Sequence, residues 1–318
     1  MRLNALTVLA LTLTLLARPA AWSDEASVSG SNAPYIYILG VAQDAGYPQA
    51  LCFEPHCRAG WEDATKRRTA VSLAVISPQE KATLLFEAPP QIPDQLYRLN
   101  LEAPLKSFPI KGIFLTHAHM GHYTGLMHFG FEAASTKGLP VFAMPRMKSF
   151  LETNGPWSQL VDFENIKLMP LHQDKPVQPV PEIKVTPFHV PHREEYSEAV
   201  GYRIEGPNQT ALFIPDIDKW QKWDRDIAEE IKRVDYALID ATFFNGDELP
   251  GRDMANIPHP SVEESMSLLK SLSSEERSRV YFIHFNHTNP LLNTVSAEAE
   301  TVRQRGFNVS TEGLRLPL

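Results

Sequence analysis

Three histidines lie close together in the segment IFLTHAHMGHYTGL, which runs from Ile113 to Leu126. His117 and His119 follow an apolar, β-branched run at a spacing of two, so their side chains can point to the same side of an expected strand end. His122 falls in the first turn of an expected helix and approaches the same point from another direction. Neutral imidazoles that converge in this way suit zinc or another borderline divalent metal, with manganese and iron as alternatives. The spacing therefore predicts a metal site.

Other titratable side chains also stand where expected strands end. His189 and His192 follow the run IKVTPF, Asp216 ends ALFIPD, and His284 ends VYFIH. His259 lies just before the start of an expected helix. Strand ends collected at one edge of a sheet can build a site from distant parts of the chain. We therefore expect these residues to meet the three histidines in space.

The elements that must position these residues are short strands. Apolar runs rich in β-branched and aromatic residues recur along the chain, and each ends in turn or polar residues, as buried strands do. They are YIYILG, AVSLAVI, ATLLFEA, GIFLTH, VFAM, IKVTPFHV, VGYRIE, ALFIPD, YALIDA and VYFIHF. Early strands succeed one another, and later ones alternate with helices. This order predicts an α+β fold, a four-layer αββα sandwich, with an open parallel α/β sheet as the alternative.

Helical signals fall between the later strands. Ser261 and Glu264 form an S-x-x-E capping box at the start of SVEESMSLLKSL. Gly306 follows SAEAETVRQR as an expected C-cap. One apolar stripe with Lys and Glu opposite indicates a helix from Ile217 through Trp220, Trp223, Ile227 and Ile231.

Composition bounds the class of protein. The 318 residues are 43% hydrophobic and 21% charged, which is typical of a soluble globular protein with ample material for a core. The net charge of −8 gives no basic surface for nucleic acid, so a small-molecule substrate is the expected partner. Nothing in the sequence indicates the oligomeric state.

The N-terminus differs from the rest of the chain. Arg2 precedes an apolar run from Ala5 to Ala17 that is short for a membrane span, and small residues follow it. This is the layout of a secretory signal peptide over residues 1–23, with cleavage near Ala21 or Ser23. An uncleaved membrane anchor is the alternative. We expect a periplasmic or secreted protein without a membrane segment after cleavage, with an extension over residues 24–34 and one domain over residues 35–318.

The segments THAHMGH, HVPHREEYSEAVGYRI, FIPDID and FIHFNH occur in an order that resembles the metallo-β-lactamase superfamily over most of residues 35–316. More narrowly, ILGVAQDAGYPQALC, YALIDATFFNGDEL and FIHFNHTNPLL are similar to segments of the pyrroloquinoline quinone biosynthesis protein B branch. The resemblance implies the αββα sandwich, with metals at the sheet edge between its two halves.

The resemblance also implies metal ligands. The first metal would be bound by His117, His119 and His192, and Asp216 would bridge it to a second metal bound by His122 and His284. His189 is the alternative to His192, although the Val-Pro step places His192 further out in the loop, as the family pattern requires.

The resemblance implies a functional role for two further residues, and each also has an interpretation in which it has no role in the site. Glu87 matches a position that supports the metal-binding loop, or it is a solvated charge at a strand end. His259 is spaced like a histidine of the phosphodiesterase branches that protonates a leaving group or binds a phosphate oxygen, or it merely flanks a helix. His259 and Asp216 are the expected catalytic residues.

Position 121 departs from the superfamily motif H-x-H-x-D-H, whose aspartate binds the second metal and receives a proton from the metal-bound water. Gly121 offers neither an oxygen nor a charge, so we expect the second metal to bind weakly or not at all. Asp44 and Asp218 are candidates for the missing oxygen, although Asp218 also suits a helix cap. Restoring the carboxylate with Gly121→Asp is expected to raise the metal content.

The chain has two cysteines, Cys52 and Cys57, and such a close pair in an exported protein indicates a disulfide. In relatives of the phosphodiesterase and quinone-biosynthesis branches, cysteines of this loop hold a structural zinc. With His56 in place of a third cysteine, Cys52, His56, Cys57 and His287 would form a Cys₂His₂ site. We favour zinc here, because a disulfide leaves both histidines without a role.

These observations favour an exported hydrolase in which a hydroxide on one or two zinc ions attacks an ester-like or phosphodiester bond. One alternative is a protein similar to pyrroloquinoline quinone biosynthesis protein B that acts on the cofactor's precursor, with iron and oxygen. That branch typically lacks the full H-x-H pair, and its chemistry is expected in the cytoplasm. Another alternative is a non-catalytic metal- or ligand-binding protein, against which the intact first set of ligands argues.

Overall fold

The computed structural model describes residues 32–249, 251–254 and 257–318. The expected signal peptide and most of the extension over residues 24–34 lie outside these ranges. Residues 32–318 cluster into a single compact unit. Within the described ranges, no helix is long and apolar enough to cross a membrane.

Two mixed sheets of seven strands each form the middle of this unit, which excludes the single open parallel sheet. The order across the first sheet is β14 (Arg315–Pro317), β1 (Tyr35–Gly40), β2 (Ser72–Ser77), β3 (Ala82–Phe86), β4 (Ile110–Phe114), β5 (Leu139–Ala143) and β6 (Ile166–Pro170). The order across the second sheet is β13 (Asn308–Val309), β12 (Val280–Ile283), β11 (Tyr236–Asp240), β10 (Thr210–Ile214), β9 (Val200–Glu205), β8 (Ile183–His189) and β7 (Val177–Val180).

The sheets face each other across an apolar core, and central strands such as β2 and β3 are buried on both faces. In β3, Leu84 and Phe86 belong to the core between the sheets, while Leu85 belongs to a second core on the outer face of the first sheet. Phe86 meets the rings of Tyr202 on β9 and Phe213 on β10 at 5.5 and 6.3 Å between ring centroids. Strands buried on both faces read as continuous apolar runs, as this sequence does.

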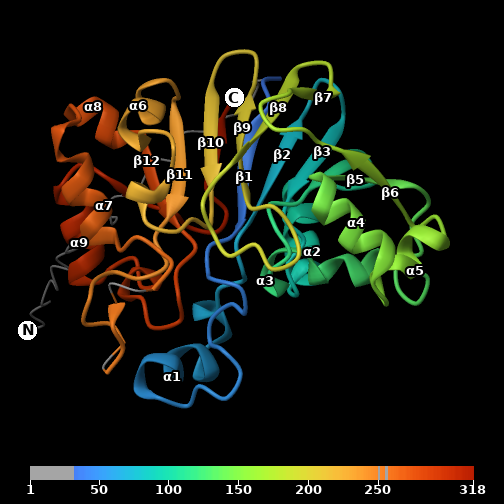
Figure 1. The fold of residues 1–318 in the computed structure, drawn as a ribbon. Helices are drawn as coiled ribbons and strands as arrows, with labels where there is room; N and C mark the ends of the chain where they lie inside the picture. The colour runs from blue at the N-terminus through green and yellow to red at the C-terminus, as the bar shows by residue number, and fades with distance from the viewer. Residues whose placement is uncertain (1–31, 250, 255–256) are drawn as a thin grey trace, which may run out of the picture. The chain divides into compact units, whose positions relative to one another are not determined.

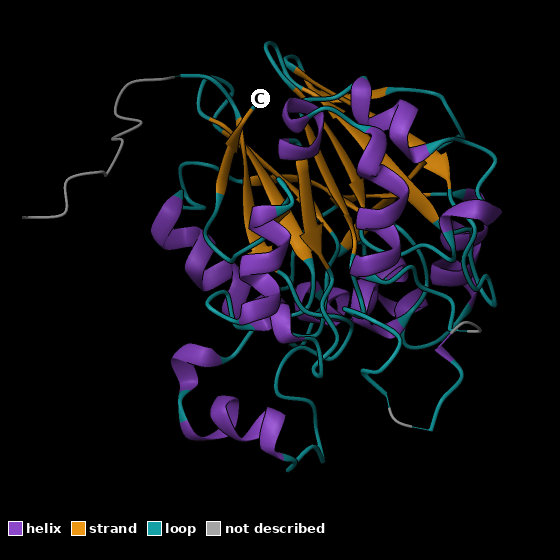
Figure 2. Ribbon diagram, turned by 90° about the vertical axis from the view of Figure 1, so that its left-hand side faces the viewer, coloured by secondary structure: helices purple, strands orange, loops and turns teal. Residues whose placement is uncertain are grey.

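Helices cover the outer face of each sheet (Figures 1 and 2). The first sheet is covered by α2 (Ile92–Glu102), α3 (Met120–Tyr123), α4 (Pro145–Thr153) and α5 (Trp157–Asp162). The second is covered by α6 (Ile227–Lys232), α7 (Val262–Leu268), α8 (Ser274–Ser278) and α9 (Ala297–Gln304). A further helix, α1 (Pro55–Glu62), lies in the segment between β1 and β2. The predicted αββα sandwich is confirmed.

Two of the three expected helix signals are confirmed. Ser261 and Glu264 form a capping box at the start of α7, and Gly306 follows α9 with a φ of +86°. The single helix expected from Ile217 is wrong, because the segment forms a short 3₁₀ turn, Trp220–Lys222, followed by α6. The Asp226 side chain accepts a hydrogen bond from Ala228 N and starts α6 there, while the stripe of apolar side chains is still buried.

Strand direction explains why polar residues gather at one edge. Strands β3 to β5 run parallel to one another in the first sheet, as β10 to β12 do in the second. Parallel strands end at the same edge of a sheet, which is where such folds place ligands. Glu87 follows β3, His117 follows β4, Asp216 follows β10, and His284 follows β12. The fold therefore delivers these side chains to one edge from both sheets.

Candidate metal centre

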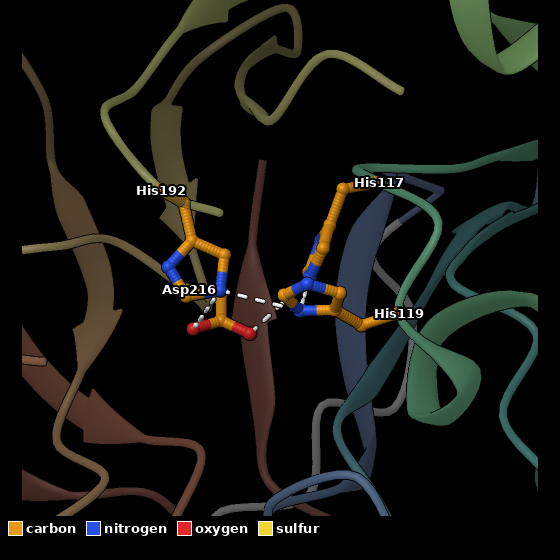
Figure 3. Close-up of side chains that lie close together, drawn as sticks. All are labelled: His117, His119, His192 and Asp216. Carbon is orange, nitrogen blue, oxygen red and sulfur yellow. Dashed lines mark hydrogen bonds and ion pairs between the residues drawn. The ribbon is translucent and has the colours of Figure 1, made fainter. Parts of the chain in front are cut away.

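Four side chains from three strand ends converge on one point (Figure 3). His117 and His119 follow β4, His192 follows β8, and Asp216 follows β10. One ligand atom from each lies within 4.8 Å of all the others. His117 and Asp216 are only 1% and 4% exposed, so burial restricts access to this point. The structure thus brings together the four residues expected to bind the first metal.

The spacing of the donor atoms suits a tetrahedral cation. His117 Nε2 lies 3.4 Å from Asp216 Oδ2, and His192 Nε2 lies 3.3 Å from Asp216 Oδ1. His192 Nε2 also lies 3.3 Å from His119 Nδ1, while His117 Nε2 approaches that same atom to 2.8 Å. Ligand atoms placed tetrahedrally at zinc distances are about 3.3 Å apart, so three of these four separations match.

A second group shares Asp216 with the first. Ligand atoms of Asp44, His122, Asp216 and His284 also lie within 4.8 Å of one another. His122 Nε2 is 3.1 Å from Asp44 Oδ1 and 3.3 Å from Asp216 Oδ2. Within the described part of the chain, Asp44 Oδ1, His122 Nε2 and His284 Nε2 are buried and form no hydrogen bond. Such atoms are rare in native proteins, so this donor set fits a cation as the common partner.

Burial and neighbouring charges set the protonation states of these groups. Burial lowers the pKa of His117 and His284, and it lowers the pKa of His192 to about 4. These imidazoles are therefore neutral at pH 7, which is the form that binds metal. Burial opposes ionisation of Asp216, but the surrounding histidines outweigh it and hold the pKa of this carboxyl well below its usual range.

His122 has the opposite protonation tendency. Burial lowers the pKa of its imidazole, but the carboxylates of Glu87, Asp216 and Asp44 outweigh burial and raise this pKa well above its usual value. Binding of a cation to His122 must therefore release a proton, which makes that binding weaker at low pH.

The ligand histidines are oriented by partners on their other ring nitrogens. Thr116 Oγ1 lies 2.8 Å from His117 Nδ1, and Thr242 Oγ1 lies 2.8 Å from His284 Nδ1. Glu87 is fully buried, with Oε1 3.3 Å from His122 Nδ1, so it is not the solvated charge of the alternative reading. Glu87 and His284 have φ angles of +75° and +71°. This region is strained for a non-glycine residue, so the surrounding structure must hold Glu87 and His284 in place.

His259 also lies at the centre, and a carboxylate that the sequence analysis missed holds it there. His259 Nδ1 is 2.9 Å from Asp240 Oδ2 and 3.2 Å from Asp216 Oδ1. Burial lowers the pKa of His259, but Asp240 and Asp216 outweigh it and raise this pKa to about 9. Asp240 ends the apolar run YALID, just as Asp216 ends ALFIPD. Selecting the polar residue at the end of each apolar run would therefore have found Asp240 as well. The placement of His259 argues against a residue that merely flanks a helix.

A cavity of about 310 Å³ lies beside His259. Its lining includes His259, Lys219, Phe243 and Asn245, so it combines an aromatic ring with an ammonium group and an amide. Lys219 Nζ lies 2.8 Å from Glu264 Oε2, and this carboxylate partly neutralises the charge of Lys219. This cavity can hold the part of a small molecule that extends away from the metal ligands.

Two residues weighed in the sequence analysis lie outside the two ligand groups. His189 ends β8, and its carbonyl oxygen accepts a hydrogen bond from Trp223 Nε1, while His192 belongs to the first group. Asp218 accepts a hydrogen bond from Lys219 N and pairs with Lys222 Nζ at 2.7 Å. Asp218 is therefore committed to the turn that follows Asp216.

The cysteines form a disulfide, which corrects the prediction of a Cys₂His₂ zinc site. Cys52 and Cys57 are joined at an S–S distance of 2.04 Å. Bonded sulfurs carry no thiolate, and the thiolate is the form that binds zinc. His56 and His287, which seemed to need a role, stack on each other with ring centroids 5.4 Å apart. The alternative weighed in the sequence analysis is the one the structure contains.

Comparison with known proteins agrees with this architecture. The family model of the β-lactamase superfamily domain matches residues 83–285, which hold most of the ligands described above. The chain belongs to this superfamily. Its fold is the metallo-β-lactamase fold, and the candidate metal ligands of this chain lie at the edge between the two sheets.

Several superfamily members resemble the chain over most of its length. Coenzyme PQQ synthesis protein B of Klebsiella pneumoniae (strain 342) is 28% identical over 315 residues, covering 89% of this chain and 98% of that protein. The crystal structure of Zn(2+)-bound PqqB from Methylobacterium extorquens is 25% identical, with a TM-score of 0.75 over 89% of this chain and all of that one. A diphosphatase of the PhnP family has the same fold, at 20% identity and a TM-score of 0.64 over 90% of this chain and 97% of that one.

Replacing Asp240 with Asn is predicted to lower the pKa of His259 from about 9 toward its usual value, because the strongest neighbouring charge that favours the imidazolium is lost. NMR titration of His259 in chelator-treated protein measures this. A histidine whose pKa is raised by folding contributes stability that is fully present below about pH 6.5 and is lost as the pH rises through about 9. The free energy of unfolding of Asp240→Asn, measured with denaturant, should therefore not show this loss of stability as the pH rises through about 9.

Asp235→Asn is the matched control, because Asp235 adjoins the opposite end of β11 and accepts a hydrogen bond from Thr210 N at 2.8 Å. It should leave the pKa of His259 unchanged. An equal pKa of His259 in wild type and Asp240→Asn would contradict the pairing.

Proposed function

We propose that the protein is an exported metal-dependent hydrolase that acts on an ester-like or phosphodiester bond of a small molecule. The observation that carries this proposal is the convergence of His117, His119, His192 and Asp216 from three strand ends. Three imidazoles and the carboxylate of Asp216 would hold a zinc ion at this point, and Asp216 is shared with the second group. Zinc in catalytic sites binds a water or substrate besides its protein ligands and can expand to five-coordinate, so a water would be able to join these four ligands.

The residues around this point suit hydrolysis. A bound zinc ion supplies a water of pKa about 7, which gives a nucleophile at neutral pH. Asp216 lies at the same point, and we assign its carboxylate as the group that would accept a proton from a water held there. His259 stays protonated at neutral pH, and Asp240 engages its Nδ1, so we assign Nε2 to proton donation to the leaving group.

Zinc is the proposed metal, with manganese and iron as alternatives. The donor sets of imidazole and carboxylate suit zinc, and the zinc-bound PqqB structure supports the same choice by similarity. Neither the net charge of −8 nor the lining of the cavity favours nucleic acid as substrate, which is why we propose a small molecule.

A second candidate function follows from the relatives. Coenzyme PQQ synthesis protein B matches nearly its whole length to this chain, which favours a role with a quinone-cofactor precursor. Identity of 28% leaves room for another reaction on the same fold. The complete H-x-H pair and the signal-like N-terminus of this chain favour the exported hydrolase. Zinc content with ester hydrolysis supports the first candidate, and iron content with oxygen uptake supports the second.

His117→Ala is predicted to lower kcat/KM for bis(p-nitrophenyl) phosphate, or for whichever generic ester, thioester or lactam is cleaved, by more than about 100-fold. Loss of a residue that only orients a ligand costs about 10–100-fold, and loss of the ligand itself costs more. His189→Ala is the matched control, since His189 ends β8, three residues before His192, but lies outside both ligand groups. Activity that survives His117→Ala would refute the mechanism.

Export is tested on the mature N-terminus. We propose that the segment through Ala21 or Ser23 is removed, because Arg2, the short apolar run and the small residues after it have the layout of a signal peptide. Sequencing of the protein recovered from the periplasm or medium should begin just after one of these residues. Recovery of chains that still begin with Met1, in the cytoplasmic fraction, would contradict export.

A further inference from the structure

Gly121 lacks the carboxylate of the superfamily motif, and the space around it also leaves no room for a side chain. Gly121 lies in α3, between the metal ligands His119 and His122, and is buried. A Cβ atom at this position would overlap Asp44 Cα and Oδ1 and would lie 2.7 Å from Asp44 Cβ. Because backbone is involved, a rotation of the Asp44 side chain cannot relieve the overlap. The turn that carries Asp44 therefore occupies the volume that a side chain at position 121 would need.

The carboxylate of Asp44 points into the second ligand group. Its side chain is 38% exposed, but Oδ1 is buried and lies 3.1 Å from His122 Nε2. In the described residues this oxygen forms no hydrogen bond, and neither do the facing nitrogens His122 Nε2 and His284 Nε2. These three atoms and a carboxylate oxygen of Asp216 lie close together, so one cation placed among them would be a partner to all four.

The turn at Asp44 is fixed to the strand end that supplies His284. Gln43 N donates a hydrogen bond to Phe285 O at 2.7 Å, and Phe285 N donates to Val41 O at 2.8 Å. On its other side, Gln91 Nε2 donates to Ala45 O at 2.8 Å. These contacts tie the position of the carboxylate to Phe285, the residue next to His284.

We propose that Asp44 is the carboxylate ligand of a second divalent cation, bound with His122, His284 and the shared Asp216. The carboxylate that the superfamily motif places at position 121 is supplied here from the loop after β1, and Gly121 makes room for it. Two neutral imidazoles and two carboxylates suit a doubly charged borderline metal such as zinc. This inference rests on the metal-binding part of the proposed function and is independent of hydrolysis.

The proposal reverses two expectations drawn from the sequence. The second site is complete despite Gly121, so it should fill with metal. Gly121→Asp, which was expected to raise the metal content, should lower it, because any side chain at 121 must displace the Asp44 turn.

The test is a zinc count on full-length mature protein, saturated with zinc, freed of excess by gel filtration and measured by elemental analysis. Asp44→Asn should hold one ion fewer per chain than wild type, and its affinity for the lost ion should fall by more than about 100-fold. Asp218→Asn is the matched control, because Asp218 is a nearby carboxylate that pairs with Lys222, and it should keep the wild-type count. An unchanged count in Asp44→Asn would overturn the proposal.

Gly121→Ala shows whether a side chain at position 121 lowers the metal content through its volume alone or through its charge. It adds a methyl group without charge, and it should also lose one ion by displacing Asp44. A wild-type count in Gly121→Ala, or a higher count in Gly121→Asp, would overturn the steric argument. Circular dichroism of the zinc-free variants checks folding, and the pair Asp44→Asn and Asp218→Asn decides the assignment if Gly121→Ala does not fold.

The zinc count also separates this proposal from the proposed function. A wild-type protein that holds a first ion but no second one would overturn the role of Asp44 and leave the hydrolase proposal standing. A protein that loses one ion in Asp44→Asn but cleaves none of the substrates would support the role of Asp44 and contradict hydrolysis.

Discussion

The buried carboxylate of Asp216 is the interaction on which the site depends. An ionised carboxylate that is 4% exposed is costly unless it is paired and hydrogen-bonded. Imidazole nitrogens within 3.6 Å of its two oxygens belong to His117, His122, His192, His259 and His284. Most of these imidazoles are kept neutral by burial, so the carboxylate and its neighbours are satisfied best by a cation placed between them. Asp216 belongs to both ligand groups and therefore joins them.

The architecture makes this convergence possible. Each sheet contributes parallel strands that end at the shared edge, so ligands separated by about a hundred residues arrive as neighbours. Rigid strands buried on both faces hold the ligand positions, and the loops beyond them carry the ligands themselves. The left-handed backbone at Glu87 and His284 shows that the chain accepts local strain to aim these two side chains. The same edge carries the Asp240–His259 pair, which places an acid next to the ligands.

Much of this could be predicted from the sequence, for physical reasons. Strands buried on both faces read as apolar runs, and the polar residue that ends each run marks the edge, which is how Asp216 and His284 were found. His192 was preferred to His189 because the family pattern places the ligand further out in the loop. Asp240 obeys the same rule and was overlooked. Asp44 could be named as a candidate ligand, but its position in the second ligand group could not be predicted. The distance between two loops depends on the path of the whole chain. Cys52 and Cys57 carry the same spacing whether they bind zinc or each other, so sequence alone could not decide between the two.

The central claim is that distant strand ends of this chain share one cation, and anomalous X-ray scattering measures it most directly. Crystals of the zinc-loaded protein should give a difference peak across the zinc edge at the point enclosed by His117, His119, His192 and Asp216. Crystals that give no peak there, or a peak only elsewhere in the molecule, would contradict the account.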